Sequence, residues 1–543
     1  MHTKNNKNYQ WLTVITISLI VATINIFHII IGLAKTAVGY TYLATGHYYL
    51  DYFEYLQYIG AGIAGRWLPI YYFTTDINLA DWRYYPYILL GKIAWIFHLS
   101  PVVAYWVSVF ILTALTLIVF YYLINKMIPK EAFSLKIIAF LTAVFSGPVY
   151  KILINNGQLA LSPYDFWYGP SSFIRRFEVV PYHTLGLLLI LLIIILINKT
   201  WENLSHLTNK SMFINGFLAA ILIILVMTFS PFPLASLIPS LLILSAISFF
   251  KVKNNRLKIL IFNSIILMLI IPFYFILRRS FGYEGMSFEV KWIVQPNWQF
   301  VLLNLGPIIL FFPFGIFEYL KTDNFLRKIL LIFTLVSYCL FMSPIAYYMG
   351  THNLRFLSSI SYICYGVLTV LGIKKISSLF KKYKKTAIIL ISALLIFYSC
   401  FLTFYSINIR AAGLDFSTPV TIWTYLPSPI IEGLQSLHNY PEANVLTGPY
   451  GEIGMFVPIF SYKRAYIGHP VRTNNIEKKR SIAYLFYSGQ MTENEANKFL
   501  KTNKIGFVIL TSLDNFDVNI INRYSFLKSI FVKPTIIIWK VTN

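Results

Sequence analysis

The sequence predicts an α-helical protein that crosses a membrane many times and carries a small α/β domain after its last span. Long apolar runs, few charged residues and connections that alternate in charge predict this class. Hydrophobic residues make up 57% of the 543 residues and charged residues only 12%, whereas a soluble domain carries roughly 25% charged residues. The chain therefore lacks the polar residues needed to cover a fully water-exposed surface.

Apolar runs near the length of about 20 residues that a helix needs to cross a bilayer recur through the first three quarters of the chain. The segment 85–97 is too short to cross at about 1.5 Å of rise per residue, so we expect it to lie at the interface or to re-enter. We predict about eleven transmembrane helices, near 11–34, 101–124, 136–150, 181–198, 213–229, 232–250, 258–277, 300–319, 329–346, 357–373 and 386–407.

The connections between these spans alternate in character. Short connections rich in lysine, such as 374–385, are cytoplasmic by the positive-inside rule. Longer, aromatic and comparatively acidic connections therefore face outward: 35–100, 151–180, 278–299 and 347–356. The expected topology is N-in and C-out, with a transmembrane domain at 1–407 and an extracytoplasmic domain at 408–543. The net charge of +24 then reflects membrane topology and predicts no nucleic-acid partner.

The tail after residue 407 has the composition of a small α/β domain. The stretches 444–448, 507–511 and 534–541 are typical of buried strands. The stretch 492–504 begins with a threonine cap, carries early acids and late lysines, and is therefore predicted to be a helix that complements its own dipole.

Three glycines of the first outer loop, Gly60, Gly62 and Gly65, fit the G-x-G-x-x-G spacing, and Asp81 follows at a suitable distance. A dinucleotide site requires a strand before the glycines and a helix after them. Here they follow an acidic, aromatic segment in an outward loop. We interpret the glycines instead as small residues that let this loop pack closely against neighbouring helices.

The segment DYFEYL that precedes the glycines is the stronger functional candidate. In a helix, Asp51, Glu54, Tyr55 and Tyr58 share one face. Acidic groups just beyond a span are costly to place unless they serve a purpose. The competing interpretation is an interfacial helix with solvated acids and a tyrosine belt.

The first outer loop resembles that of the GT-C superfamily of polytopic membrane glycosyltransferases, although it lacks the adjacent acidic pair that some members carry. The resemblance rests on Asp51, 55–56, 65–67, 74–94, 179–188, 351–366 and 446–470. It implies inverting transfer of a sugar from a polyprenyl-phosphate donor. The acceptor would be a protein, a lipid or a cell-wall glycan outside a prokaryotic-type plasma membrane.

Such a transferase needs one carboxylate as general base, because a lipid phosphate leaves without much protonation. Asp51 is the first candidate and Glu54 the second. The departing phosphate needs cations. The candidates are Arg355, His352, His183, Arg175 and Arg176. The competing interpretation of such cations is that they anchor the protein to lipid headgroups. A divalent metal, Mg or Mn, is an alternative bridge to the phosphate, with ligands drawn from Asp51, Asp165 and Glu178. In the tail, Glu452 and His469 are expected to be structural or to face the acceptor.

Two other classes of function remain open at this stage. A transporter or flippase of lipid-linked glycans would show broken helices and polar groups near mid-membrane. The acids here gather at the outer rim, which favours surface chemistry. A catalytically silent scaffold of an envelope complex would keep the fold, and substitution of Asp51 would have no effect on it.

Overall fold

The computed structural model describes residues 2–155, 158–166, 169–177, 180–251, 253–280, 289–295, 297–412, 414, 422–450 and 452–542. Their contacts divide the chain into two compact units. Unit 1 consists of Met1–Ile26 and Val109–Ile409, and unit 2 of Phe27–Ser108 and Arg410–Asn543. The expected boundary at residue 407 thus lies close to the second boundary between units. The large first loop, however, groups with the tail and not with the helices that flank it in sequence.

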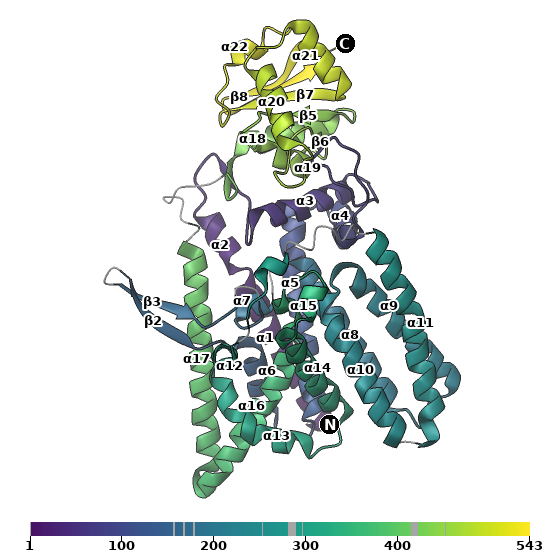
Figure 1. The fold of residues 1–543 in the computed structure, drawn as a ribbon. Coiled ribbons are helices and arrows are strands. Elements are labelled where there is room, and N and C mark those ends of the chain that lie inside the picture. Colours follow the sequence, from purple (N-terminus) through teal and green to yellow (C-terminus); the bar gives the residue numbers. More distant parts are fainter. Residues whose placement is uncertain are drawn as a thin grey trace. The chain divides into compact units, whose positions relative to one another are not determined.

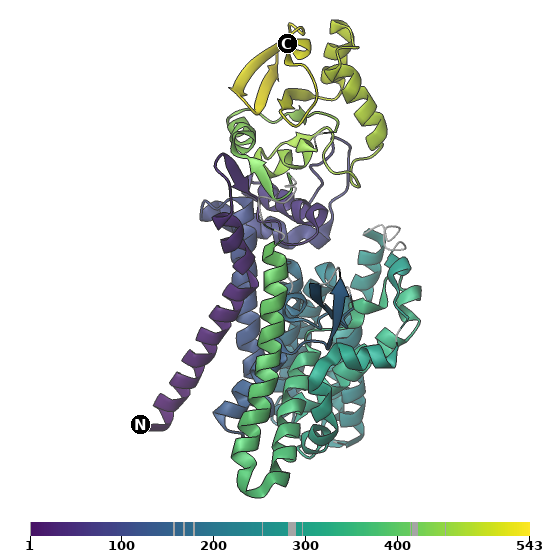
Figure 2. The same cartoon turned by 90° about the vertical axis from the view of Figure 1, so that its left-hand side faces the viewer.

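Unit 1 is a bundle of long apolar helices (Figures 1 and 2). Its main helices are α1 (His2–Asn25), most of α5 (Pro101–Met127), α6 (Phe133–Phe145), α8 (Pro181–Glu202), α9 (Asn209–Phe229), α10 (Phe232–Lys251), α11 (Arg256–Ser280), α12 (Trp298–Leu305), α13 (Phe312–Leu320), α14 (Phe325–Met342), α16 (Ser361–Ser377) and α17 (Lys384–Ala412). Buried aliphatic and aromatic side chains of these helices form one large core.

The apolar helices make the protein an integral, multi-pass membrane protein. Within the described residues, eight helical segments are long and apolar enough to cross a bilayer, or nine if α1 and the short helix α2 (Phe27–Ala34) form one span. One of the eight contains both α16 and α17, which are separated by non-helical backbone at Lys381. The expected span at 136–150 corresponds to α6, whose 13 residues are fewer than a straight crossing needs.

The tail in unit 2 forms the predicted α/β fold around a five-stranded sheet of order β6-β5-β7-β9-β8. Its strands are β5 (Asn444–Leu446), β6 (Arg464–Ala465), β7 (Ile505–Thr511), β8 (Leu527–Lys533) and β9 (Ile536–Val541). β5 runs parallel to β6 and β7, whereas β9 is antiparallel to β7 and β8. The three predicted strands correspond to β5, β7 and β9.

The helix predicted at 492–504 is α21 (Glu493–Thr502). The Thr492 hydroxyl accepts a hydrogen bond from the Glu495 amide, and the Glu495 carboxylate accepts one from the Thr492 amide. This reciprocal capping box satisfies two of the amides that a helix N-terminus leaves unpaired. With α20 (Ile476–Tyr487), α21 contributes side chains to the apolar core on the sheet.

The first loop contributes two helices to unit 2, α3 (Tyr49–Ile63) and α4 (Tyr85–Ile96), which pack side by side. A Cβ atom on Gly62 would lie 2.3 Å from the Ile88 carbonyl oxygen, so only glycine permits this approach. Gly65 has a φ of +87° and donates to the Gly62 carbonyl, as in a Schellman helix end. The close-packing interpretation is confirmed for Gly60 and Gly62 but not for Gly65, where nothing lies within 4 Å of a Cβ atom and the positive φ is the reason for glycine. The dinucleotide motif is not formed.

Candidate active site

Helix α3 is buried almost all round, yet it presents one carboxylate. Of its 15 residues, all of them described, Asp51 alone is exposed. Asp51 lies in the first turn, where the positive end of the helix dipole stabilises a negative charge. The predicted acidic and aromatic face is therefore divided, because Glu54, Tyr55 and Tyr58 are buried.

Glu54 joins the first loop to the tail. Its side chain is 4% exposed, accepts a hydrogen bond from the Tyr71 hydroxyl at 2.7 Å and forms an ion pair with Arg472 at 3.4 Å. Burial alone would lower the pKa of Arg472, but the charge of Glu54 raises it above its ordinary value. Burial, and then the same carboxylate, raise the pKa of Tyr71. Glu54 is thus enclosed by its partners, whereas Asp51 is exposed.

Aromatic rings surround the beginning of α3. The rings of Tyr55 and Tyr87 stack with centroids 4.8 Å apart, and Tyr105 extends this stack. The Tyr49 ring stacks on Trp423 with centroids 4.6 Å apart. The first turn of α3 therefore has a rigid aromatic setting.

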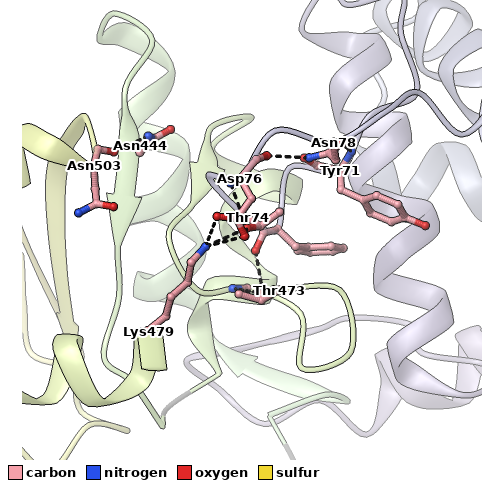
Figure 3. A network of polar contacts seen from close by, with 10 residues as sticks. Tyr71, Thr74, Asp76, Asn78, Asn444, Thr473, Lys479 and Asn503 are labelled. Atoms are coloured by element: carbon pink, nitrogen blue, oxygen red, sulfur yellow. Dashed lines mark hydrogen bonds and ion pairs between the residues drawn. The ribbon is translucent and has the colours of Figure 1, made fainter. Parts of the chain in front are cut away.

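A second polar network fastens the loop that follows α3 to the tail (Figure 3). The Lys479 ammonium donates to both carboxylate oxygens of Asp76 at 2.9 Å and to the Thr74 hydroxyl at 3.0 Å. The Thr473 hydroxyl donates to the Phe73 carbonyl at 3.1 Å. Burial alone would raise the pKa of Asp76, but the hydrogen bonds from Lys479 and Thr74 lower it. The tail is consequently the platform that holds the first loop.

The two tail residues singled out in the sequence have different environments. His469 is 3% exposed, and its Nδ1 accepts a hydrogen bond from the Val471 amide. Burial lowers the pKa of His469 to about 4, so the ring is neutral at physiological pH. Glu452 is partly exposed and adopts a φ of +55°, and burial raises the pKa of its carboxyl. His469 therefore has a structural environment, while Glu452 retains access to solvent.

The cationic candidates belong to unit 1, and each is already engaged. The Arg355 guanidinium makes a two-point ion pair with Glu289, at 2.5 Å and 2.9 Å, and Thr351 donates to the same carboxylate. Burial raises the pKa of Glu289, but its contacts with Arg355 and Thr351 lower it by more. The pKa therefore lies below its ordinary value. The neighbouring His352 is 1% exposed, and burial lowers its pKa to about 4.

Arg175 and Arg176 are adjacent in sequence but differ completely in surroundings. The Arg175 side chain is 38% exposed and lies 3.5 Å from the Asp165 carboxylate. The Arg176 side chain is buried and stacks on the Tyr362 ring. Its guanidinium donates five hydrogen bonds to the carbonyls of Pro170, Ala143, Val144, Ser146 and Ser171. Since a guanidinium has five N–H donors, Arg176 has none left for a phosphate.

The remaining candidates do not assemble a metal centre among the described residues. His183 lies in the first turn of α8, where its ring contacts Tyr182. Glu178 lies outside the described residues. Asp51 and Asp165 belong to different units, and no three His, Cys, Asp or Glu side chains within the described ranges group as metal ligands. The described acids therefore do not fit a Mg or Mn site with three protein ligands.

Sequence reasoning missed Glu289, Tyr71 and Arg472, which are the partners of the candidate residues. Glu289 lies 66 residues before Arg355, and Arg472 lies 418 residues after Glu54. The local sequence carries no signal for such distant pairs. For Glu289, the only signal in the sequence is that it is an acidic residue in a predicted outer connection, 278–299.

No family model and no curated protein matches the sequence. Solved structures do resemble the fold. The oligosaccharyltransferase of Archaeoglobus fulgidus, tethered to an acceptor peptide, aligns over 99% of this chain and 74% of its own, with 13% identity and a TM-score of 0.51. ArnT of Cupriavidus metallidurans, bound to undecaprenyl phosphate, aligns over 97% of both chains, with 9% identity and a TM-score of 0.49.

The arabinofuranosyltransferase AftD from mycobacteria aligns over 98% of this chain and 40% of its own, with 10% identity and a TM-score of 0.45. At these identities the likeness concerns the fold alone. The likeness to the oligosaccharyltransferase extends over nearly the whole chain. The protein therefore has a GT-C-like fold, as the resemblance of its first loop predicts.

Proposed function

We propose that the protein is a membrane glycosyltransferase that moves a sugar, with inversion, from a polyprenyl-phosphate donor to an extracytoplasmic acceptor. Asp51 is the proposed general base. The single observation that carries this proposal is the exposure of Asp51 on a helix that is otherwise buried. The GT-C-like fold supplies the context. The first loop and the tail lie outside in this proposal, because the lysine-rich connections belong to the cytoplasmic side.

The proposed reaction uses the carboxylate once. Asp51 takes the proton of the acceptor hydroxyl as the acceptor oxygen forms a bond to the anomeric carbon of the donor sugar. The bond between that carbon and the phosphate oxygen breaks on the opposite face, and the electron pair leaves with the polyprenyl phosphate. General-base catalysis of this kind contributes about 10²–10⁴-fold to a rate.

Glu54 is not proposed as the base. Its carboxylate already accepts a hydrogen bond from Tyr71 and pairs with Arg472, so its oxygens are engaged by these partners. We assign Glu54 to holding α3 in place, three residues away from Asp51.

Two arginines are proposed to meet the departing phosphate. Arg175 is the more accessible, since its side chain is 38% exposed and its carboxylate partner lies 3.5 Å away. Arg355 is 19% exposed and would have to exchange one oxygen of Glu289 for a phosphate oxygen. His352 and His183 remain weaker candidates beside them. Arg176 has no part in the proposed mechanism.

The proposal is tested with purified protein in lipid nanodiscs and a panel of polyprenyl-phosphate sugars. One of these donors should yield free polyprenyl phosphate only when an acceptor is present, and NMR of the product should show the inverted anomer. A flippase would move a fluorescent donor across liposomes without releasing phosphate. Movement without release, or a retained anomer, would contradict the proposal.

A further inference from the structure

A two-stranded hairpin projects from unit 1 beside α17 (Figures 1 and 2). It consists of β2 (Tyr150–Asn155) and β3 (Gln158–Pro163), which pair in antiparallel register. Among the described residues, no other strand joins this sheet. Isolated hairpins are only marginally stable in water, so its surroundings decide whether it persists.

The two faces of the hairpin differ in chemistry. Tyr150 is opposite Pro163 and Ile152 is opposite Leu161, so these four share one face, which Ile154 extends. Lys151 and Ser162 are opposite each other on the other face. Ile152 is 69% exposed and Ile154 is 73% exposed. Moving these two isoleucines from water into an apolar environment would therefore be favourable.

The sequence of α17 fixes the depth of the hairpin in the bilayer. Lysines at 381, 382, 384 and 385 mark one membrane edge. A hydrocarbon layer of about 30 Å corresponds to about 20 residues of helix, which places the other edge near Tyr405. Phe397 and Phe404 between these edges are 72% and 64% exposed, as lipid-facing side chains are. Tyrosine is also the residue expected at such an edge.

Tyr405 holds the hairpin at this level. Its hydroxyl accepts a hydrogen bond from the Leu161 amide at 3.0 Å and lies 3.3 Å from the Leu161 carbonyl. About two helical turns earlier in α17, the Tyr398 hydroxyl donates to the Pro148 carbonyl at 2.8 Å. Strand edges need such partners where water is scarce, because unpaired backbone groups are costly in lipid.

We propose that the β2–β3 hairpin is a membrane anchor that lies in the interface of the leaflet at this end of α17. Ile152 and Ile154 insert among the acyl chains, and Lys151 on the opposite face reaches the lipid phosphates. The bilayer is the favoured occupant because the hairpin is bonded to α17 at Tyr405, next in sequence to Phe404, which is exposed as lipid-facing side chains are. The anchor does not depend on the proposed transferase activity.

The test is the depth of single nitroxide labels in liposomes. Ile152→Cys, Ile154→Cys and Lys151→Cys are each labelled in a full-length protein whose three native cysteines are replaced. Labels at 152 and 154 should collide with oxygen several-fold more, and with a water-soluble nickel complex several-fold less, than the label at 151. Because positions 151, 152 and 154 are exposed, the substitutions should not impair folding, and circular dichroism checks that the helical content is unchanged.

Val532 on β8 provides the matched control, because it is also an exposed apolar strand residue, at 65% exposure, but lies in the tail. A label at Val532→Cys should be fully accessible to nickel. Equal nickel accessibility at 152, 154 and 532 would overturn the anchor. Dipolar broadening between the labels of two copies would overturn the anchor as well, because it would show that the apolar face of the hairpin contacts a second copy of the chain.

Discussion

Two arginines, one from each unit, have their charge satisfied in opposite ways. Arg176 in unit 1 is surrounded by neutral carbonyls, two of which, from Ala143 and Val144, belong to the last turn of α6. Arg472 in unit 2 is paired with the Glu54 carboxylate and lies over the Tyr71 ring. Both cations are satisfied, but only the second depends on a charge brought from a distant part of the chain.

A second arginine of unit 1 follows the first pattern. Arg327 donates to the carbonyl of Met127 at the end of α5 and to those of Glu318 and Tyr319 at the end of α13. Helix C-termini carry partial negative charge and unpaired carbonyls, so they hold a cation without a carboxylate. Arg176 and Arg327 therefore cap helices of the membrane unit, whereas Arg472 joins two segments of unit 2.

The largest effect is expected from removing a helix-capping arginine. Arg176→Met leaves five buried carbonyls without their donor and should lower the free energy of unfolding by at least about 4 kcal/mol, because each unsatisfied group costs about 1–3 kcal/mol. Thermal unfolding in nanodiscs measures it. Lys382→Met, which removes an exposed cation of the same unit, is the control. An unfolding temperature unchanged by Arg176→Met would contradict the claim that Arg176 stabilises unit 1 through these carbonyls.

The joining pair in unit 2 should have a smaller effect. Glu54→Gln is expected to cost about 2–3 kcal/mol, below the 3–5 kcal/mol of a fully buried pair, because the Arg472 side chain is 36% exposed. In a double-mutant cycle with Arg472→Met, the two costs should not add. The exposed pair of Glu477 and Arg480 is the control, with about 0–1 kcal/mol expected. Additive costs at Glu54 and Arg472 would show that the pair does not act as one unit.

The smallest effect is a dependence of stability on pH. His469 takes up a proton near pH 6.5 when unfolded but only near pH 4 when folded. The contribution of His469 to stability is therefore complete above pH 6.5 and falls below it by about 1.4 kcal/mol per pH unit, in addition to that of His352, whose pKa is lowered in the same way. His469→Gln should reduce the slope of this part of the profile, measured as unfolding temperature from pH 7.5 to pH 5. Parallel profiles of the two proteins would exclude His469 as the source.

Much of the fold could be predicted because it depends on local patterns. Apolar runs locate the membrane helices, strand-like runs locate β5, β7 and β9, and the cap at Thr492 locates α21. The segment corresponding to β8 was missed because four of its seven residues are exposed, which removes the buried-strand pattern. The length of α6 was overestimated because the predicted span ran on through Ser146, Gly147 and Pro148, whereas the helix ends at Phe145.

The candidate site was less predictable because it depends on contacts between distant residues. Arg175 and Arg176 are identical in type and adjacent, yet one is half-exposed and the other is enclosed by carbonyls. Likewise Asp51 and Glu54 share a predicted face, but only Asp51 is exposed. The tail encloses Glu54, and no periodicity within the first loop can reveal a partner that lies 418 residues away.

The most direct test of the central claim is the rate of polyprenyl phosphate release by Asp51→Asn. With a donor from the panel and a saturating acceptor, we expect a fall of about 10²–10⁴-fold with an unchanged unfolding temperature. Glu477→Gln also removes an exposed acid from the first turn of a helix and should keep the full rate. Release by Asp51→Asn at the rate of the unsubstituted protein would contradict the assignment of this carboxylate as the base.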